Sequence, residues 1–195
     1  MRTEGEMNAD LLYRMAVGFN EVGIKAAWQL RGNGADAFRM IGPAAVNLAL
    51  ATELYLKTIH LLNARRPPGI HDLWKLFNAL PALTIDLLEK RYGEALAVAK
   101  DELKSMHMRI VRGNEEEKPV FPPAPVTVKV LLERHNHAFT SWRYLHEFSS
   151  KGYEYHFDYH EMHVFCGVLN AHAADLLNAR PPRFGVASTQ TGEPV

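Results

Sequence analysis

Cysteine is nearly absent from this sequence. The 195 residues contain a single cysteine, Cys166, so an intramolecular disulfide cannot form and a structural zinc site built mainly on thiolates is excluded. Lysine plus arginine equals aspartate plus glutamate, at 22 residues each. A chain without net charge has no overall field that attracts nucleic acid or an anionic membrane, although a local basic patch remains compatible with this balance.

Long apolar segments and the common catalytic motifs are missing as well. No apolar run is long enough to span a bilayer, and the sequence shows no signal peptide, so we expect a cytoplasmic protein without a membrane partner. A Gly-rich phosphate loop, a dinucleotide fingerprint, a nucleophile elbow and a paired-cysteine metal motif are all absent. We therefore expect no cofactor, and the sequence favours a function other than catalysis.

Apolar residues recur at helical spacing along most of the chain, and proline and glycine separate the periodic segments. The pattern predicts an all-α bundle of five or six helices in a single domain over residues 8–179. The proline-rich segment at about 113–125 is expected to be a surface loop, and residues 180–195 to be a flexible, disordered tail. The main helices are expected at about 8–31, 44–63, 84–111, 127–148 and 154–178, with a short amphipathic piece at 70–77.

The segment Ala44–Leu62 is apolar almost all the way round, which is typical of a helix buried in the middle of a bundle. Three polar residues interrupt it. Glu53, Lys57 and His60 fall within an arc of about 60° on this helix. Burying an unpaired charge is costly, so this stripe either reaches solvent, with Glu53 and Lys57 as a helical ion pair, or lines a cleft between helices or subunits.

Three histidines lie close together near the C-terminus. His156, His160 and His163 are spaced i, i+4 and i+7 on the predicted last helix, opposite its apolar face. Two imidazoles at i and i+4 can chelate Zn²⁺ or Ni²⁺, but no HExxH motif is present. The alternative interpretation is a solvated histidine stripe on an outward face.

Arginine and histidine also occur together in two other places. Arg143 and Glu147 are i,i+4 neighbours, and His146 lies closer to the apolar stripe of the same predicted helix. An arginine beside a histidine could stabilise a phosphate and move a proton, the minimum for metal-independent cleavage of RNA through its 2′-hydroxyl. The alternative is that His146 is a hydrogen-bonded core residue.

The second such group precedes the short helix at 70–77. Arg65 and Arg66 stand just before His71 and Asp72, where a helix N-terminus would present backbone N–H groups to an anion. The alternative is that Asp72 or His71 simply caps the helix and the arginines close the previous one.

Several of these residues belong to segments that match one family pattern. The segments are Ala51-Thr52-Glu53-Leu54-Tyr55-Leu56-Lys57, then His71-Asp72-Leu73 with Leu76, then Phe139, Trp142-Arg143-Tyr144 and Glu147. This combination resembles the HEPN superfamily over about residues 35–178. The resemblance implies a bundle of four or more helices that dimerises, in a prokaryotic defence, toxin–antitoxin or nucleotidyltransferase-associated setting.

Many HEPN proteins are metal-independent RNases whose active site is an arginine followed, after four to six residues, by a histidine late in the domain. This chain departs from that pattern, because only two residues separate Arg143 from His146, and because Arg66 and His71 lie in an early loop. The resemblance therefore implies no nuclease site. It implies instead a polar frame that is structural or binds nucleotide or RNA, formed by Glu53, Lys57, His71, Arg143 and Glu147.

The sequence thus predicts a HEPN-like, homodimeric binding or regulatory module with an RNA, nucleotide or antitoxin partner. One alternative is an RNase that uses an atypical pair drawn from Arg143, His146, Arg65, Arg66 and His71. Another is a metal-binding helical protein that uses His156, His160 and His163.

Overall fold

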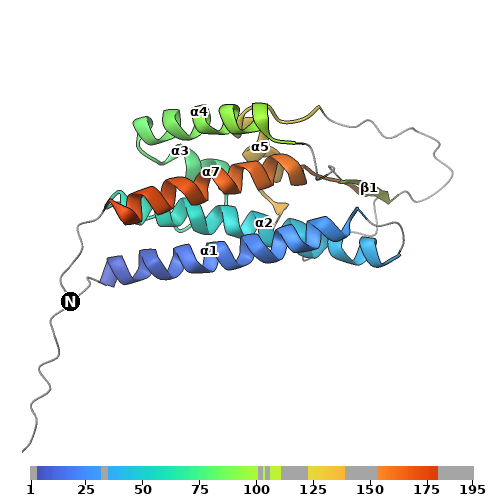
Figure 1. The fold of residues 1–195 in the computed structure, drawn as a ribbon, viewed down its shortest axis with the longest axis horizontal. Helices are drawn as coiled ribbons and strands as arrows, with labels where there is room; N and C mark the ends of the chain where they lie inside the picture. Colours follow the sequence, from blue (N-terminus) through green and yellow to red (C-terminus); the bar gives the residue numbers. More distant parts are fainter. Residues whose placement is uncertain are drawn as a thin grey trace, which may run out of the picture.

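The computed structural model describes residues 4–31, 35–100, 103, 106–110, 123–138 and 153–179. These residues form six α-helices and one two-stranded antiparallel sheet (Figure 1). The predicted class, an all-α bundle of five or six helices, is confirmed. The elements are α1 (Glu4–Gln29), α2 (Ala35–Leu62), α3 (Leu73–Asn78), α4 (Ala82–Val98), β1 (Met106–Ile110), α5 (Val128–His135), β2 (Tyr153–Phe157) and α7 (Tyr159–Asn178).

Helix α2 is the central helix that its composition predicts. Tyr55, Leu56 and Ile59 have no exposed surface, because α1 packs along one side of α2 and α7 along another (Figure 1). The helix begins earlier than expected, and Pro43 lies inside it instead of in its first turn. Proline removes one backbone hydrogen bond, but the buried residues Ala44 and Ala45 pack into the core directly after it and hold the helix continuous.

Aromatic side chains connect the other helices to this centre. The ring of Phe165 on α7 lies 6.0 Å from the ring of Phe77 on α3 and 5.6 Å from that of Tyr92 on α4, edge to face in both pairs. Cys166 is fully buried beside them, with its sulfur 3.2 Å from the hydroxyl of Thr52 on α2. Burial raises the pKa of this thiol to about 12, so the only cysteine of the chain is a core residue.

The predicted helices at 84–111 and 154–178 are both too long. Helix α4 ends at Val98, and the final helix begins at Tyr159. Residues 106–110 and 153–157 instead form an antiparallel pair in which Met106 lies opposite Phe157. The sequence Tyr-Glu-Tyr-His-Phe alternates aromatic and polar residues, a strand period that the helical interpretation overlooked.

Parts of three predicted segments lie outside the described residues. They are residues 113–122 of the proline-rich loop, residues 139–148 of the helix expected to start at 127, and the tail from residue 180. The described start of that helix agrees with the prediction, since Thr127 caps α5 through a 3.3 Å hydrogen bond that the Val130 N–H donates. Within the described part of the chain, no helix is long and apolar enough to cross a membrane.

Small residues let α1 approach α2 closely. Ala16, Gly23 and Ala27 are buried on the side of α1 that faces α2. A Cβ atom added to Gly23 would lie 2.9 Å from Leu48 Cγ and 3.0 Å from the Leu48 backbone nitrogen. The backbone nitrogen cannot move without shifting α2, so the absence of a side chain at Gly23 allows these two helices to lie this close.

We expect Gly23→Ala to destabilise the fold by about 1 kcal/mol or more, because the overpacking cost of about 1–3 kcal/mol exceeds the helix propensity gained. Gly93→Ala in α4 is the matched control. Nothing lies within 4 Å of a Cβ at Gly93, so this change should stabilise the helix by up to about 1 kcal/mol. Urea unfolding of both variants measures the difference, and equal effects would contradict the close packing of α1 on α2.

Candidate functional site

The polar stripe of α2 faces other parts of the chain. The Glu53 carboxylate is 5% exposed and lies 2.7 Å from Lys57 Nζ, one turn along the helix. His71, from the segment before α3, places its Nδ1 at 3.0 and 3.1 Å from the two oxygens of the same carboxylate. The carboxylate is therefore paired on two sides, and its contact with His71 fixes the segment between α2 and α3 against the bundle.

His60 completes the stripe in the interior. Its side chain is buried, and Nε2 lies 2.9 Å from the carbonyl oxygen of Leu76 on α3. Burial lowers the pKa of His60, against the effect of this hydrogen bond, and the nearby charge of Arg65 lowers it further. A neutral imidazole that donates Nε2–H to the Leu76 carbonyl satisfies this geometry, so His60 links α2 to α3.

We expect Glu53→Gln to cost about 1–3 kcal/mol of unfolding free energy, because Lys57 loses its counter-charge in a buried position. His71→Ala should cost less than about 1 kcal/mol, since the His71 side chain is 71% exposed. Urea unfolding at neutral pH measures both. A larger loss for His71→Ala than for Glu53→Gln would contradict the assignment of Glu53 as the centre of this cluster.

The structure does not support an anion site before α3. The N-terminus of α3 is already capped, because Asp72 Oδ1 accepts a 2.8 Å hydrogen bond from the Lys75 N–H. Arg65 and Arg66 are exposed and follow Ala64, whose left-handed backbone (φ 55°) ends α2. A carboxylate thus occupies the positive end of the helix, in agreement with the capping interpretation. The remaining predicted residues, Arg143, His146 and Glu147, lie outside the described part of the chain.

The three C-terminal histidines do not share one helical face. His156 belongs to β2, and only His160 and His163 lie on α7, so the predicted stripe of three on a single helix is wrong. Nor does this stretch face only solvent, since His160 is 7% exposed. Among the residues that the structure describes, no group of three or more His, Cys, Asp or Glu side chains is arranged to hold a metal ion.

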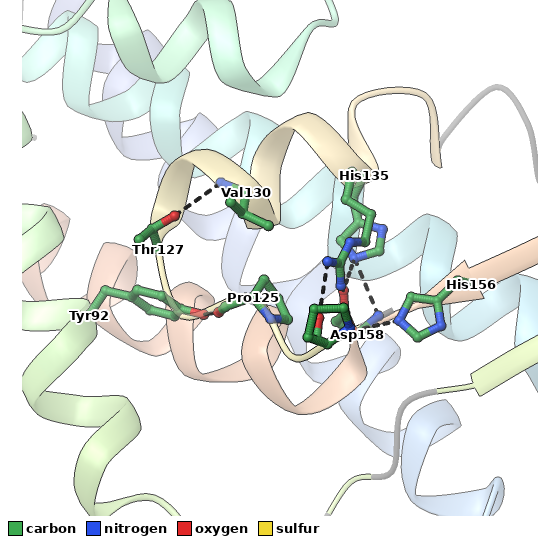
Figure 2. A network of polar contacts seen from close by, with 9 residues as sticks. Tyr92, Pro125, Thr127, Val130, His135, His156 and Asp158 are labelled. Carbon is green, nitrogen blue, oxygen red and sulfur yellow. Dashed lines mark hydrogen bonds and ion pairs between the residues drawn. The ribbon is translucent and has the colours of Figure 1, made fainter. Parts of the chain in front are cut away.

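A buried network around Asp158 was not predicted from the sequence. Asp158 lies between β2 and α7, and its side chain is 1% exposed. Arg134 Nη1 lies 2.7 Å from Oδ2, His135 Nε2 lies 3.0 Å from Oδ2, and His156 Nε2 lies 2.6 Å from Oδ1 (Figure 2). One carboxylate thus joins α5, β2 and the start of α7.

The network extends to the segment before α5. Arg134 Nη2 donates a 3.0 Å hydrogen bond to the carbonyl oxygen of Pro123, and the hydroxyl of Tyr92 donates a 2.8 Å hydrogen bond to that of Pro125 (Figure 2). These contacts fasten residues 123–125 to α5 and α4. Both terminal nitrogens of the Arg134 guanidinium therefore have partners: Nη1 contacts Asp158, and Nη2 contacts the Pro123 carbonyl.

Electrostatics keep Asp158 ionised. Burial alone would raise its pKa, but hydrogen bonds from His135 and His156 outweigh burial and hold the pKa well below its ordinary value of 3.8. Burial lowers the pKa of His135, against the effect of Asp158, and the backbone N–H of Asp158 donates a 3.3 Å hydrogen bond to the same Nε2. The side chains of Arg134 and His156 are only 19% and 11% exposed, so the network is enclosed. This burial indicates a structural role, in which the network connects α5, β2 and α7.

We expect Asp158→Asn to cost about 3 kcal/mol at neutral pH, since it breaks a buried, charge-assisted network. The pKa of Asp158 is lower in the folded than in the unfolded chain, so the unfolded chain binds more protons in acid. The stability that this carboxylate supplies is therefore complete well above pH 3.8 and is lost progressively as the pH falls below that value toward the lower pKa of the folded state.

Urea unfolding at several pH values between about 3 and 7 measures this dependence. Toward the acid end of that range, the free energy of unfolding of Asp158→Asn should decrease less than that of the wild type. Asp86→Asn, an exposed change on α4, is the control and should follow the wild type. An Asp158→Asn curve parallel to that of the wild type would contradict the assignment.

A cleft of about 760 Å³ opens between α4, α7 and the end of α1. In Figure 1, α4 lies on one side of α7 and α1 on the other. This volume is within the range of sites that hold small organic ligands. Side chains of these helices and of Leu103 form its walls. The apolar part of the lining consists of Ala95, Ala99, Leu103, Val164, Val168 and Ala171, with Gly167 among them.

The polar part of the lining carries more positive than negative charge. Arg91 and Lys100 are cationic, Asp175 is the one carboxylate among the described lining residues, and His160 and His163 add two imidazoles. Arg91 Nη1 lies 3.0 Å from Asp175 Oδ2, and this ion pair joins α4 to α7 at the edge of the cleft. Because Arg91 and Asp175 neutralise each other, Lys100 supplies the net positive charge of the described lining.

Trp28 gives the cleft an aromatic wall. Trp28 is 37% exposed and lies near the end of α1. The guanidinium of Arg31 lies 4.8 Å from the ring centroid, which is a cation–π contact. An exposed indole next to a basic rim can stack on a planar ring of a ligand. The sequence analysis identified His160 and His163 but not this setting, because α1 and α4 are distant from them in the chain.

Comparisons of the chain with known protein families, with curated proteins and with solved structures found no match.

Proposed function

We propose that this chain is a HEPN-like binding module that takes up a small anionic ligand with a planar or apolar part, such as a nucleotide, in the cleft between α1, α4 and α7. The observation that carries the proposal is the combination of an apolar lining with a basic rim in a cleft of about 760 Å³. Such a cleft removes apolar ligand surface from water while a few placed cations orient the charged end.

The two ends of a nucleotide match different parts of the lining. A base can stack near Trp28 and on the alanine and valine side chains, where aromatic stacking contributes about 1–3 kcal/mol. A phosphate needs cations or N–H donors, which Lys100 and the imidazoles of His160 and His163 can supply. Gly167 contributes no side chain, which leaves room for the ligand along α7.

Two buried carboxylates, Glu53 and Asp158, are not available to a ligand. A general base needs a carboxylate or imidazole that can reach a substrate. Glu53 and Asp158 are 5% and 1% exposed and are both occupied by internal partners. The relation to HEPN proteins is supported by the frame residues Glu53, Lys57 and His71, which lie together in this fold.

Titration of the intact chain with ATP and AMP by isothermal calorimetry tests the proposal. We expect saturable binding of the nucleotide. Lys100→Ala should weaken it about tenfold or more, since a hydrogen bond to a charged group contributes about 1.5–3 kcal/mol. Gly167→Leu should weaken binding because the new side chain projects into the cleft, and it should leave the fold intact because nothing lies within 4 Å of a Cβ there.

Lys90→Ala is the matched control, because Lys90 is an exposed lysine of α4 outside the cleft. It should bind nucleotide as the wild type does. The proposal is wrong if neither nucleotide binds, or if Gly167→Leu binds nucleotide as tightly as the wild type. It is also wrong if the purified protein cleaves single-stranded RNA in EDTA and Arg143→Ala abolishes the cleavage, because the chain would then be the RNase that is the alternative interpretation.

A further inference from the structure

One ion pair occupies an edge of the cleft. Arg91 on α4 and Asp175 on α7 both line the cleft, and Arg91 Nη1 lies 3.0 Å from Asp175 Oδ2. Their side chains are 36% and 63% exposed, so water competes for both ions and the pair contributes little to stability. Another anion can therefore replace the Asp175 carboxylate on Arg91 at small cost.

Helices α4 and α7 do not depend on this ion pair to stay together. Leu88 and Tyr92 of α4 are buried, and the ring of Tyr92 packs on that of Phe165 of α7 with 5.6 Å between the centroids. This apolar contact remains when Arg91 and Asp175 separate, so the exchange leaves the bundle unchanged.

His172 lies close enough to the ion pair to sense both of its charges. Its side chain is largely buried, and burial lowers the pKa of the imidazole. The charge of Arg91 lowers this pKa further, against the effect of Asp175. His172 is therefore neutral near pH 7, and Arg91 supplies the positive charge in this part of the cleft.

We propose that Arg91 is a second anion-binding residue of the cleft, which a ligand with several negative charges takes over from Asp175. This inference rests on the proposed function and names the ligand class that the site prefers, a nucleoside polyphosphate. A phosphate monoester carries about −1.5 to −2 charges near pH 7, and a triphosphate carries more. With Arg91 paired, the described lining has only the net charge of Lys100, so such a ligand requires a second cation.

The positions of the two cations favour a chain of phosphates over a single one. Arg91 lies in the middle of α4, and Lys100 follows its end at Val98. The helical residues 91–98 alone span about 10 Å. A triphosphate extends along this separation better than one phosphate group does, so Arg91 should contribute more to the binding of ATP than to that of AMP.

Calorimetric titration of the intact chain with ATP and AMP tests the proposal, with Asp175→Asn, Arg91→Ala and the double variant. Asp175→Asn should tighten ATP binding about two- to fivefold, since the gain is limited to the free energy of an exposed ion pair. Arg91→Ala should weaken ATP binding about fivefold or more, and AMP binding less. Thermal unfolding of all variants should stay close to that of the wild type, because the pair is exposed.

The double variant separates exchange on Arg91 from simple repulsion of the ligand by Asp175. If Asp175 acts by occupying Arg91, adding Asp175→Asn to Arg91→Ala should change the affinity for ATP by less than about twofold. Glu94→Gln is the matched control, because it also removes a carboxylate from an exposed ion pair of α4, that with Lys90 at 3.9 Å, outside the cleft. It should bind ATP as the wild type does.

The outcomes distinguish this inference from the proposed function. Both are wrong if the wild type binds neither nucleotide. The inference alone is overturned if the wild type binds ATP and Asp175→Asn binds it no more tightly. It is also overturned if Asp175→Asn gives the same gain with and without Arg91, or if Arg91→Ala weakens AMP binding as much as ATP binding.

Discussion

The central helix α2 is enclosed on nearly all sides, and this enclosure constrains every polar group that it carries. A charge removed from water needs partners inside the fold. Glu53 receives them from Lys57 one turn away and from His71 in the following segment, and His60 receives the Leu76 carbonyl of α3. The connection from α2 to α3 is therefore specified by polar contacts as well as by apolar packing. The same contacts fix where α3 lies against α5 and α7.

Asp158, near the C-terminal end of the sequence, is a second buried charge that needs partners inside the fold. Its carboxylate is paired with Arg134 and with two histidines from separate elements, and this arrangement joins α5, β2 and α7 where the chain leaves the two-stranded sheet. Glu53 and Asp158, two of the buried carboxylates, thus both bind partners inside the fold. Other polar groups line the cleft, where Lys100 exceeds the charge that Arg91 and Asp175 balance. The proposed recognition of a ligand and the maintenance of the fold therefore depend on different residues.

Helical periodicity alone predicts the class of the fold and the burial of α2, because each depends on local spacing. It also indicates that Glu53 and Lys57 form a pair, and the contact with His71 is present. It does not predict β1 and β2, since a five-residue strand depends on a partner more than forty positions away. The Asp158 network was missed for the same reason: Arg134, His135 and Asp158 are joined only when α5 meets β2. The cleft likewise needs three helices, of which α1 and α7 lie at opposite ends of the chain. Periodicity describes one segment at a time, so it cannot predict contacts between segments that are distant in the sequence.

Helix α1 links the packing of the bundle to the wall of the cleft. Ala16, Gly23 and Ala27 form the side packed on α2, and Trp28 lies roughly 120° away around the helix. Because the missing side chain at Gly23 lets the helix pack tightly on α2, it also sets where Trp28 stands in the cleft. A change in the contact of α1 with α2 would therefore move a wall of the cleft as well as alter the stability of the fold.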